Sequence, residues 1–160
     1  MKQLICYILL RADLSTMGYG KGAAQASHAA NAFTEMEVIR PLENKKTINP
    51  DVQEWRRSTS QGFGTVLTIS VPDLNTMRDV VSAAQTLGFP AQCVKDPTYP
   101  YHVPNEFVPL IAADIHAIPP IPVNQNMHVC FREEETTAYV FGDKANLAVI
   151  LARFGLVPND

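Results

Sequence analysis

The chain alternates short apolar runs with stretches in which apolar residues recur at helical spacing. Four runs have the length and the β-forming residues that are typical of strands, namely residues 3–11, 63–71, 89–96 and 136–142. The first run is almost continuously apolar, which predicts a strand that is covered on both faces of a sheet.

Helix signals separate these runs. Capping residues and terminal glycines predict helices over residues 21–36, 49–60, 72–88 and 143–155. Asn49 or Asp51 would cap the second of these, and Gly88 would end the third. The order of elements predicts an α/β fold, a three-layer α/β/α arrangement with a mixed four-stranded sheet and helices on both faces.

Three stretches do not fit a regular element. Residues 37–48 are expected to be a polar connector, and the acidic run at residues 133–135 is expected to be a solvated turn before a strand. Residues 97–126 are rich in proline and show no sustained period, which predicts a long extended insertion. We therefore expect one domain over residues 1–160 that contains this insertion.

Composition narrows the class of protein. A chain of 160 residues can bury one core without disulfides or a metal. The formal net charge of −3 argues against a broad attraction to nucleic acid, although a local basic patch stays compatible with it. Three cysteines in apolar runs predict buried thiols in a reducing cytoplasm. No apolar stretch is long enough for a bilayer span, so we expect a soluble cytoplasmic protein.

The stretch "MGYGKGAAQASHAA", residues 17–30, is the most informative one. Its glycine spacing is not that of a dinucleotide-binding turn, and no second strand supplies a ribose-binding acid near residue 40. A phosphate-binding P-loop would need a glycine where Ser15 stands and a hydroxyl residue where Gly22 stands. The remaining interpretation is a glycine turn that opens a helix, with backbone N–H groups that suit a phosphate or a carboxylate.

Three polar residues follow this turn on one face of the expected helix. Lys21, Gln25 and His28 fall within roughly 60° of one another at helical spacing, so their side chains can line one site. The alanines around them would let the helix approach the sheet closely. An ordinary solvated face explains the same pattern. His28 in particular could have only a structural role, as a hydrogen-bond partner of a buried neighbour.

The segment "LLRADLSTMGYGKGAAQASHAA" resembles the N-terminal signature of the type II peptidyl-tRNA hydrolases. Similarity extends over residues 3–97 and again over "TTAYVFGDKANL". The positions that match the family are Arg11, Asp13, Lys21, Gln25, Ser27, His28 and Asp96. The chain departs from the family at Tyr19, where the motif has a lysine, at Gly22 and Ala26, and in "DPTYP", which brings Thr98 nearer to Asp96 than the family's threonine.

The resemblance implies hydrolysis of the ester that joins a peptide to the terminal ribose of tRNA, without a metal or another cofactor. It implies catalytic roles for Lys21, Gln25, Asp96, Thr98 and His28. Asp96 would orient and deprotonate water, Lys21 would stabilise the oxyanion or hold the terminal phosphate, and Gln25 would donate hydrogen bonds. Substrate-binding residues would be Asp13, Gly18, Gly20, Ser27 and Tyr99. The histidines lack metal-ligand spacing, which agrees with the absence of a metal from this expectation.

Contacts with tRNA are expected at a local group of cations, which consists of Arg40, Lys45, Lys46, Arg56 and Arg57. The same residues could be an ordinary solvated surface. Tyr99, Tyr101, His102 and Trp55 are candidates for stacking on terminal bases, with Trp55 more typical of a core anchor.

Two further functions stay open on the sequence alone. One is a tRNA- or protein-binding module that keeps the fold while the altered "DPTYP" segment removes the chemistry. The other is a hydrolase for a different acyl or peptidyl ester. The resemblance also suggests a homodimer, and it implies no membrane partner.

Overall fold

The computed structural model describes residues 2–109 and 118–156. The chain forms two compact units, of which the first comprises residues 1–94 and 136–160 and the second comprises residues 95–135. Each unit is described by itself. The expectation of one domain over residues 1–160 stays a prediction.

The first unit holds the elements that the sequence pattern predicts and one additional short helix. Its strands are β1 (Leu4–Arg11), β2 (Thr65–Val71), the start of β3 (Ala91–Pro104) and the end of β5 (Met127–Asp143). Its helices are α1 (Tyr19–Thr34), α2 (Arg40–Glu43), α3 (Pro50–Arg57), α4 (Leu74–Thr86) and α6 (Lys144–Arg153).

The strands form a mixed sheet in the order β2-β1-β5-β3, with a fifth strand, β4 (Ile121–Asn124), paired to β5. Strand β1 runs parallel to β2, with Ile5 opposite Thr65, and antiparallel to β5, with Leu9 opposite Ala138. The α/β class and the mixed sheet are confirmed. The additional strand β4 lies inside the predicted insertion, where a four-residue strand has too little pattern to be recognised.

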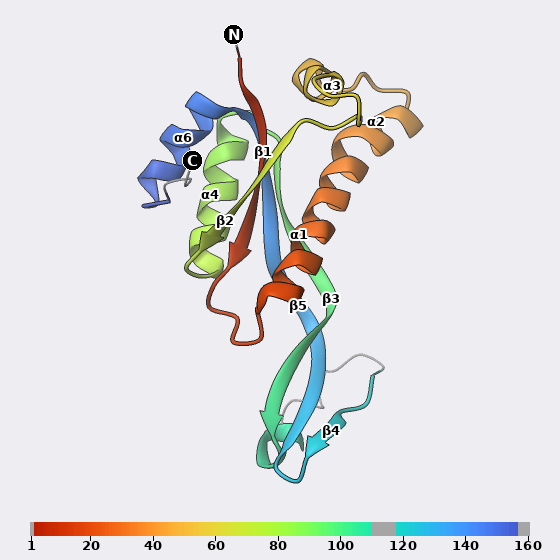
Figure 1. Ribbon diagram of the computed structural model, residues 1–160, viewed down its shortest axis with the longest axis vertical. Coiled ribbons are helices and arrows are strands. Elements are labelled where there is room, and N and C mark those ends of the chain that lie inside the picture. The colour runs from red at the N-terminus through yellow and green to blue at the C-terminus, as the bar shows by residue number, and fades with distance from the viewer. Residues whose placement is uncertain (1, 110–117, 157–160) are drawn as a thin grey trace. The chain divides into compact units, whose positions relative to one another are not determined.

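Alternate residues of β1 enter two separate cores. Tyr7 and Leu9 pack with residues of α4 and α6, whereas Cys6 and Ile8 pack with Phe33 of α1 and with the α3 side chains. Figure 1 shows α4 and α6 on one side of the sheet and α1 on the other. The prediction that helices cover both faces is therefore confirmed, and it explains why the β1 sequence is apolar throughout.

Aromatic rings fix α1 and α3 against the sheet. The Phe33 ring lies 5.4 Å from that of Trp55 and 5.3 Å from that of Tyr139, both with edge-to-face geometry. Trp55 is buried, and its indole N–H donates to the carbonyl of Thr65 at 3.0 Å. Trp55 is thus a core anchor, and the alternative role in stacking on a base is wrong because its faces are covered.

Helix caps appear where the sequence predicts them. The Asn49 side chain accepts from the Asp51 N–H at 2.9 Å, and the Asp73 side chain accepts from the Thr76 N–H at 2.7 Å. Gly88 follows α4 with a φ of +80°, a left-handed conformation that glycine adopts without strain.

The expected polar connector at residues 37–48 is helical in its first half. A π-helical turn, Glu35–Ile39, continues α1 directly into α2. The side chain of Val38 is buried in the α1 core, and Pro41, which has no N–H to donate, follows the π-helical turn within α2. Of the apolar residues in this helical half, Val38 is buried while Ile39 and Leu42 are exposed, so the sequence shows no helical period of buried positions.

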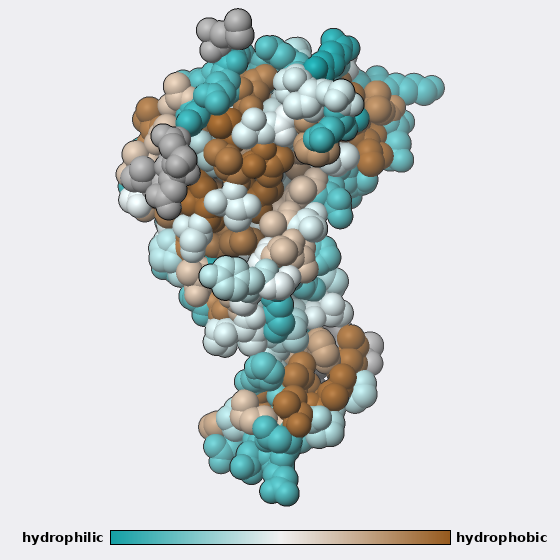
Figure 2. All heavy atoms as spheres, in the orientation of Figure 1, coloured by the Kyte–Doolittle hydropathy of each residue, from teal (hydrophilic) through white to brown (hydrophobic). Residues whose placement is uncertain are grey.

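The second unit consists of the far ends of β3 and β5, the short strand β4 and a 3₁₀ turn, Asn105–Phe107. The expected insertion at residues 97–126 falls here, and its residues 110–117 lie outside the described residues. Figure 2 shows apolar side chains gathered on the visible face of this unit. Among the described residues, its exposed large apolar side chains are Phe107, Ile121 and Val123.

The acidic run at residues 133–135 lies within β5 and is not a turn before it. The strand tolerates these charges because partners in the same unit hold them. Glu133 pairs with Lys95 at 2.6 Å, and Glu134 accepts a hydrogen bond from Tyr101 at 2.5 Å. Strand β3 likewise continues to Pro104, beyond the expected end at residue 96.

Candidate functional site

The loop between β1 and α1 begins with an ion pair. Arg11 donates to Asp13 through Nε at 2.9 Å and through a terminal nitrogen at 2.7 Å. Arg11 is buried, and its hydrogen bond to Asp13 lowers the pKa of that carboxyl. Asp13, expected to bind substrate, therefore holds the loop that leads into α1.

The first turn of α1 is open toward solvent. The cap residue Gly18 has no side chain that could accept from the first N–H groups of the helix, and a Cβ atom added at Gly18 or Gly20 would meet no heavy atom within 4 Å. Packing inside the protein therefore does not require glycine at either position. Gly18 stands at the N-cap of α1, a position that accepts glycine, and Gly20 lies within the first turn.

The three polar residues of α1 differ in their surroundings. Gln25 is 4% exposed, and its Oε1 accepts a hydrogen bond from the hydroxyl of Thr136 at 2.5 Å. Lys21 is partly buried, whereas His28 is exposed. Ser27 is also exposed, and its hydroxyl donates to the carbonyl of Ala23 within the helix. An entirely solvated face is therefore excluded for this stripe.

Thr136 is a residue that the sequence reasoning missed. It is fully buried on β5, and the fold brings it to Gln25 across 111 residues of chain. The Thr136 hydroxyl donates to the amide oxygen and so orients the Gln25 amide, whose nitrogen is its donor end. No local pattern around Thr136 distinguishes it from other strand threonines.

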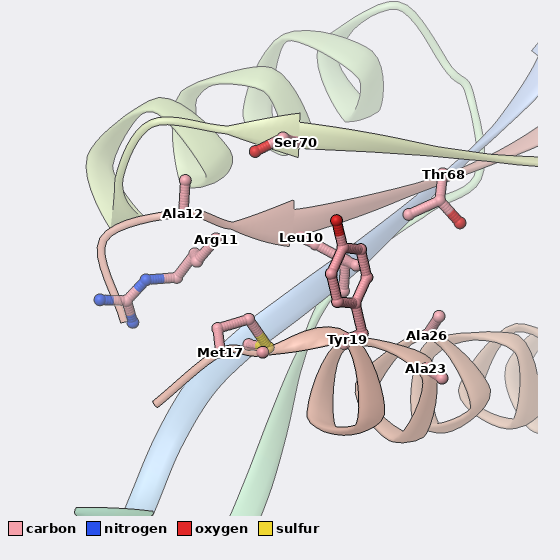
Figure 3. A pocket seen from close by; sticks show the side chains of 11 residues that line it. Leu10, Arg11, Ala12, Met17, Tyr19, Ala23, Ala26, Thr68 and Ser70 are labelled. Carbon is pink, nitrogen blue, oxygen red and sulfur yellow. The ribbon is translucent and has the colours of Figure 1, made fainter. Parts of the chain in front are cut away.

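A groove of about 550 Å³ lies on another flank of α1. Figure 3 shows it between the start of α1 and the strands β1 and β2, with the Tyr19 ring projecting from the helix on the side of the strands. Its lining consists of Leu10, Arg11, Ala12, Met17, Gly18, Tyr19, Gly22, Ala23, Ala26, Thr68 and Ser70. Gly18 is the one expected substrate-binding residue among these, and Lys21, Gln25 and His28 are not part of the lining.

In the second unit, Asp96 and Thr98 are joined by a local hydrogen bond within β3. The Thr98 N–H donates to Asp96 Oδ1 at 2.8 Å, and the Thr98 hydroxyl lies 3.4 Å from the same oxygen. Asp96 is 9% exposed, while Thr98 is exposed. The structure thus brings Gln25 together with Thr136 in one unit and Asp96 together with Thr98 in the other.

The tyrosines proposed for base stacking are held in place. Tyr99 is fully buried, and its ring meets Tyr101 edge-on at 5.3 Å, so it offers no free face to a base. Tyr101 is covered by the guanidinium of Arg132, 4.2 Å from its ring centroid. Burial and the hydrogen bond to Glu134 raise the pKa of Tyr101 to about 12. His102 is exposed beside a cavity of about 240 Å³ in this unit.

The expected tRNA-binding cations lie on α2, α3 and the loop between them. Lys45, Lys46 and Arg57 are exposed, and Arg57 lines two surface clefts. Arg40 is paired with Glu35 at 3.2 Å, and Arg56 donates to the carbonyl of Gly62. Three of the five residues therefore present charge to solvent without an ion pair among the contacts recorded for residues 2–109 and 118–156.

The described residues contain no group of three or more histidine, cysteine or acidic side chains that could hold a metal ion. Within the same residues, no helix is long and apolar enough to cross a membrane. The cysteines are free thiols, with Cys6 and Cys130 buried and Cys93 partly buried. Burial raises the pKa of Cys6 to about 12, which makes this thiol a poor nucleophile.

Comparison with known families gives one match. The model of the family described as "Peptidyl-tRNA hydrolase PTH2" matches residues 4–120, which is more than half of the chain. The comparison with curated proteins found no match.

Proposed function

The chain belongs to the peptidyl-tRNA hydrolase PTH2 family, and from that premise we propose that Lys21, Gln25 and Asp96 carry out its reaction. It is an ester hydrolase that acts on peptidyl-tRNA. The reaction adds water to the ester carbonyl and releases the peptide carboxylate and the terminal ribose hydroxyl. It needs an oriented water, a stabilised oxyanion and a proton for the ribose oxygen.

The observation that supports this assignment best is the hydrogen bond from Thr136 to Gln25. A buried amide whose oxygen is occupied has a fixed orientation, so its N–H group is pre-aligned as a donor. In the proposal, this donor binds the carbonyl oxygen of the ester or the attacking water. Lys21, one turn earlier on the same helix, stabilises the negative charge that develops on that oxygen.

Asp96 takes the part of the general base. The Thr98 N–H and hydroxyl both approach Oδ1 and orient the carboxylate, which in the proposal accepts a proton from the attacking water. Thr98 is then a positioning residue. His28, exposed on α1, stays a predicted proton donor to the ribose oxygen.

The test is release of free tRNA from purified peptidyl-tRNA by the full chain. Lys21→Ala and Asp96→Asn should each lower turnover by about 10²-fold or more while the variants still fold cooperatively. Asp79→Asn, an exposed change on α4, is the matched control for charge removal and should leave turnover unchanged. Full activity of either first variant would overturn the residue assignment. Absence of turnover in the wild type, with tRNA still bound, would favour the binding module.

We further propose that the enzyme acts in the cytoplasm as a homodimer. Both proposals rest on the family resemblance, and the three free thiols agree with a reducing compartment. Sedimentation of the purified chain measures the oligomeric state, and a monomer at working concentration would contradict the dimer. Fractionation of the host cells tests the location.

A further inference from the structure

We propose that the groove between α1 and β2 binds the terminal nucleobase of the tRNA, with Tyr19 as its stacking surface. The inference rests on the proposed function, because it assigns part of the same substrate to a second flank of the same helix. The groove and Tyr19 both belong to the first unit.

The exposure of Tyr19 is the observation that supports the proposal most strongly. The residue is 102% exposed, as much as in an unfolded chain, although it lines a groove. Burial in the fold therefore gives this aromatic ring no stabilisation, and the start of a helix does not favour tyrosine. Tyr19 also stands at a point where the chain departs from the lysine of the family motif, so it is a feature of this protein itself.

The floor of the groove suits a flat ring. Leu10 contributes an apolar side chain, and Gly22, Ala23 and Ala26 are small residues on the facing side of α1. A planar heterocycle can slide between such a floor and an exposed tyrosine. Stacking of this kind is sequence-tolerant because every base has a π-face. The volume of about 550 Å³ is also in the range of small-molecule sites.

The edge of the groove carries hydroxyl groups. Thr68 and Ser70 are exposed on β2, and they stand opposite Ile8 and Leu10 of β1 in the parallel register. They therefore share the face of the sheet that α1 covers. A base needs polar partners at its ring edge and an apolar partner at its face, and this groove offers both. An aliphatic peptide side chain would have no use for the two hydroxyls.

The arrangement also fits the proposed chemistry. Tyr19 and Lys21 are two residues apart, which is about 3 Å along the helix axis, and they lie on different flanks of α1. A substrate with its terminal base in the groove would have its ribose beside the open first turn of α1. In the proposal, the ester extends from that ribose around the first turn to Lys21 on the other flank.

The decisive experiment compares two substrates, namely intact peptidyl-tRNA and the same peptidyl-tRNA lacking only its terminal base. Tyr19→Ala should raise the KM for the intact substrate about tenfold and leave kcat within about twofold, because stacking contributes to binding. The abasic substrate should show no change in KM. Tyr19→Trp keeps an aromatic ring and should have the wild-type KM for the intact substrate. Phe63→Ala removes another exposed aromatic ring and should leave KM and kcat unchanged.

Two results would overturn the inference. One is an equal change in KM for both substrates, which would assign Tyr19 to another part of the molecule. The other is a change that follows the identity of the peptide's last side chain, which would assign the groove to the peptide. Because both results require a wild type that hydrolyses peptidyl-tRNA, they differ from failure of the proposed function, in which no wild-type turnover is seen.

Discussion

At the scale of single residues, the buried pair Gln25 and Thr136 allows an effect on catalysis to be distinguished from an effect on stability. Thr136→Val keeps the shape of the side chain but leaves the Gln25 oxygen without its donor. We expect a loss of about 1–3 kcal/mol in the free energy of unfolding. We also expect a drop in kcat, because the Gln25 amide then loses its fixed orientation. Denaturant unfolding and single-turnover hydrolysis measure the two effects.

The neighbouring residue provides a matched control. Thr137 is equally buried, and its hydroxyl donates to the carbonyl of Leu9 at 2.7 Å. Thr137→Val should therefore destabilise the fold by a similar amount while kcat stays unchanged. If both variants lose kcat equally, the Gln25 orientation has no special part in the reaction.

The ion pair between Arg11 and Asp13 makes a pH-dependent contribution to stability. Because the pKa of Asp13 is lower in the folded than in the unfolded state, the contribution is present above the unfolded value of about 3.9. It is lost as the pH falls through the folded value. Asp13→Asn should thus destabilise the protein at neutral pH, and its difference from the wild type should shrink below pH of about 4.

Urea midpoints measured from neutral pH to about pH 2 test this expectation. Asp79→Asn, which removes an exposed carboxylate of α4, should show no such convergence with the wild type. A difference between Asp13→Asn and the wild type that stays constant across the range would show that the pair with Arg11 is not the cause.

At the scale of elements, the sequence predicts those that carry their own signals. The apolar run of β1 and the caps Asn49 and Asp73 are local features, and the elements form where they stand. The long far ends of β3 and β5 carry Pro97, Pro100 and the acidic run, which oppose strand formation locally. Pairing between segments distant in the chain overrides that local preference.

The residues of the candidate site differ in the same way, because some follow from local spacing and others depend on pairing between distant segments. Lys21 and Gln25 follow from the spacing on one helix, whereas Thr136 reaches Gln25 only through the order of strands in the sheet. The groove likewise needs β2 beside β1, which places Thr68 and Ser70 opposite the start of α1. Residues that depend on strand order have no signature within a short sequence window.

The open first turn of α1 permits a test of its glycines. Gly20 is helical with free space around it, so Gly20→Ala should raise the free energy of unfolding by about 0.5–1 kcal/mol. If the space is kept for substrate, the same change should raise KM. Ala24→Gly, on the exposed face of the same helix, should lower stability by a similar amount and leave KM unchanged. Gly20→Ala with unaltered KM would show that substrate does not approach this backbone.

At the scale of the whole molecule, the central question is how an acidic protein attracts tRNA. The net charge of −3 gives no general attraction, so affinity has to come from a local group of cations. Two of the three exposed members of that group are Lys46, on the loop before α3, and Arg57, at the end of α3. Their charges act through phosphate contacts, which release counterions and carry little sequence preference.

The double variant Lys46→Ala/Arg57→Ala should weaken tRNA binding and reduce the slope of log Kd against log salt by about 1 to 2, because each lost phosphate contact removes close to one counterion. Titrations at several salt concentrations measure the slope, and Arg153→Ala, at the end of α6, is the control for loss of a cation elsewhere. An unchanged slope in the double variant would mean that these residues are only a solvated surface. A reduced slope in the Arg153→Ala control would instead show that the attraction depends on net charge, and the local group would then have no special role.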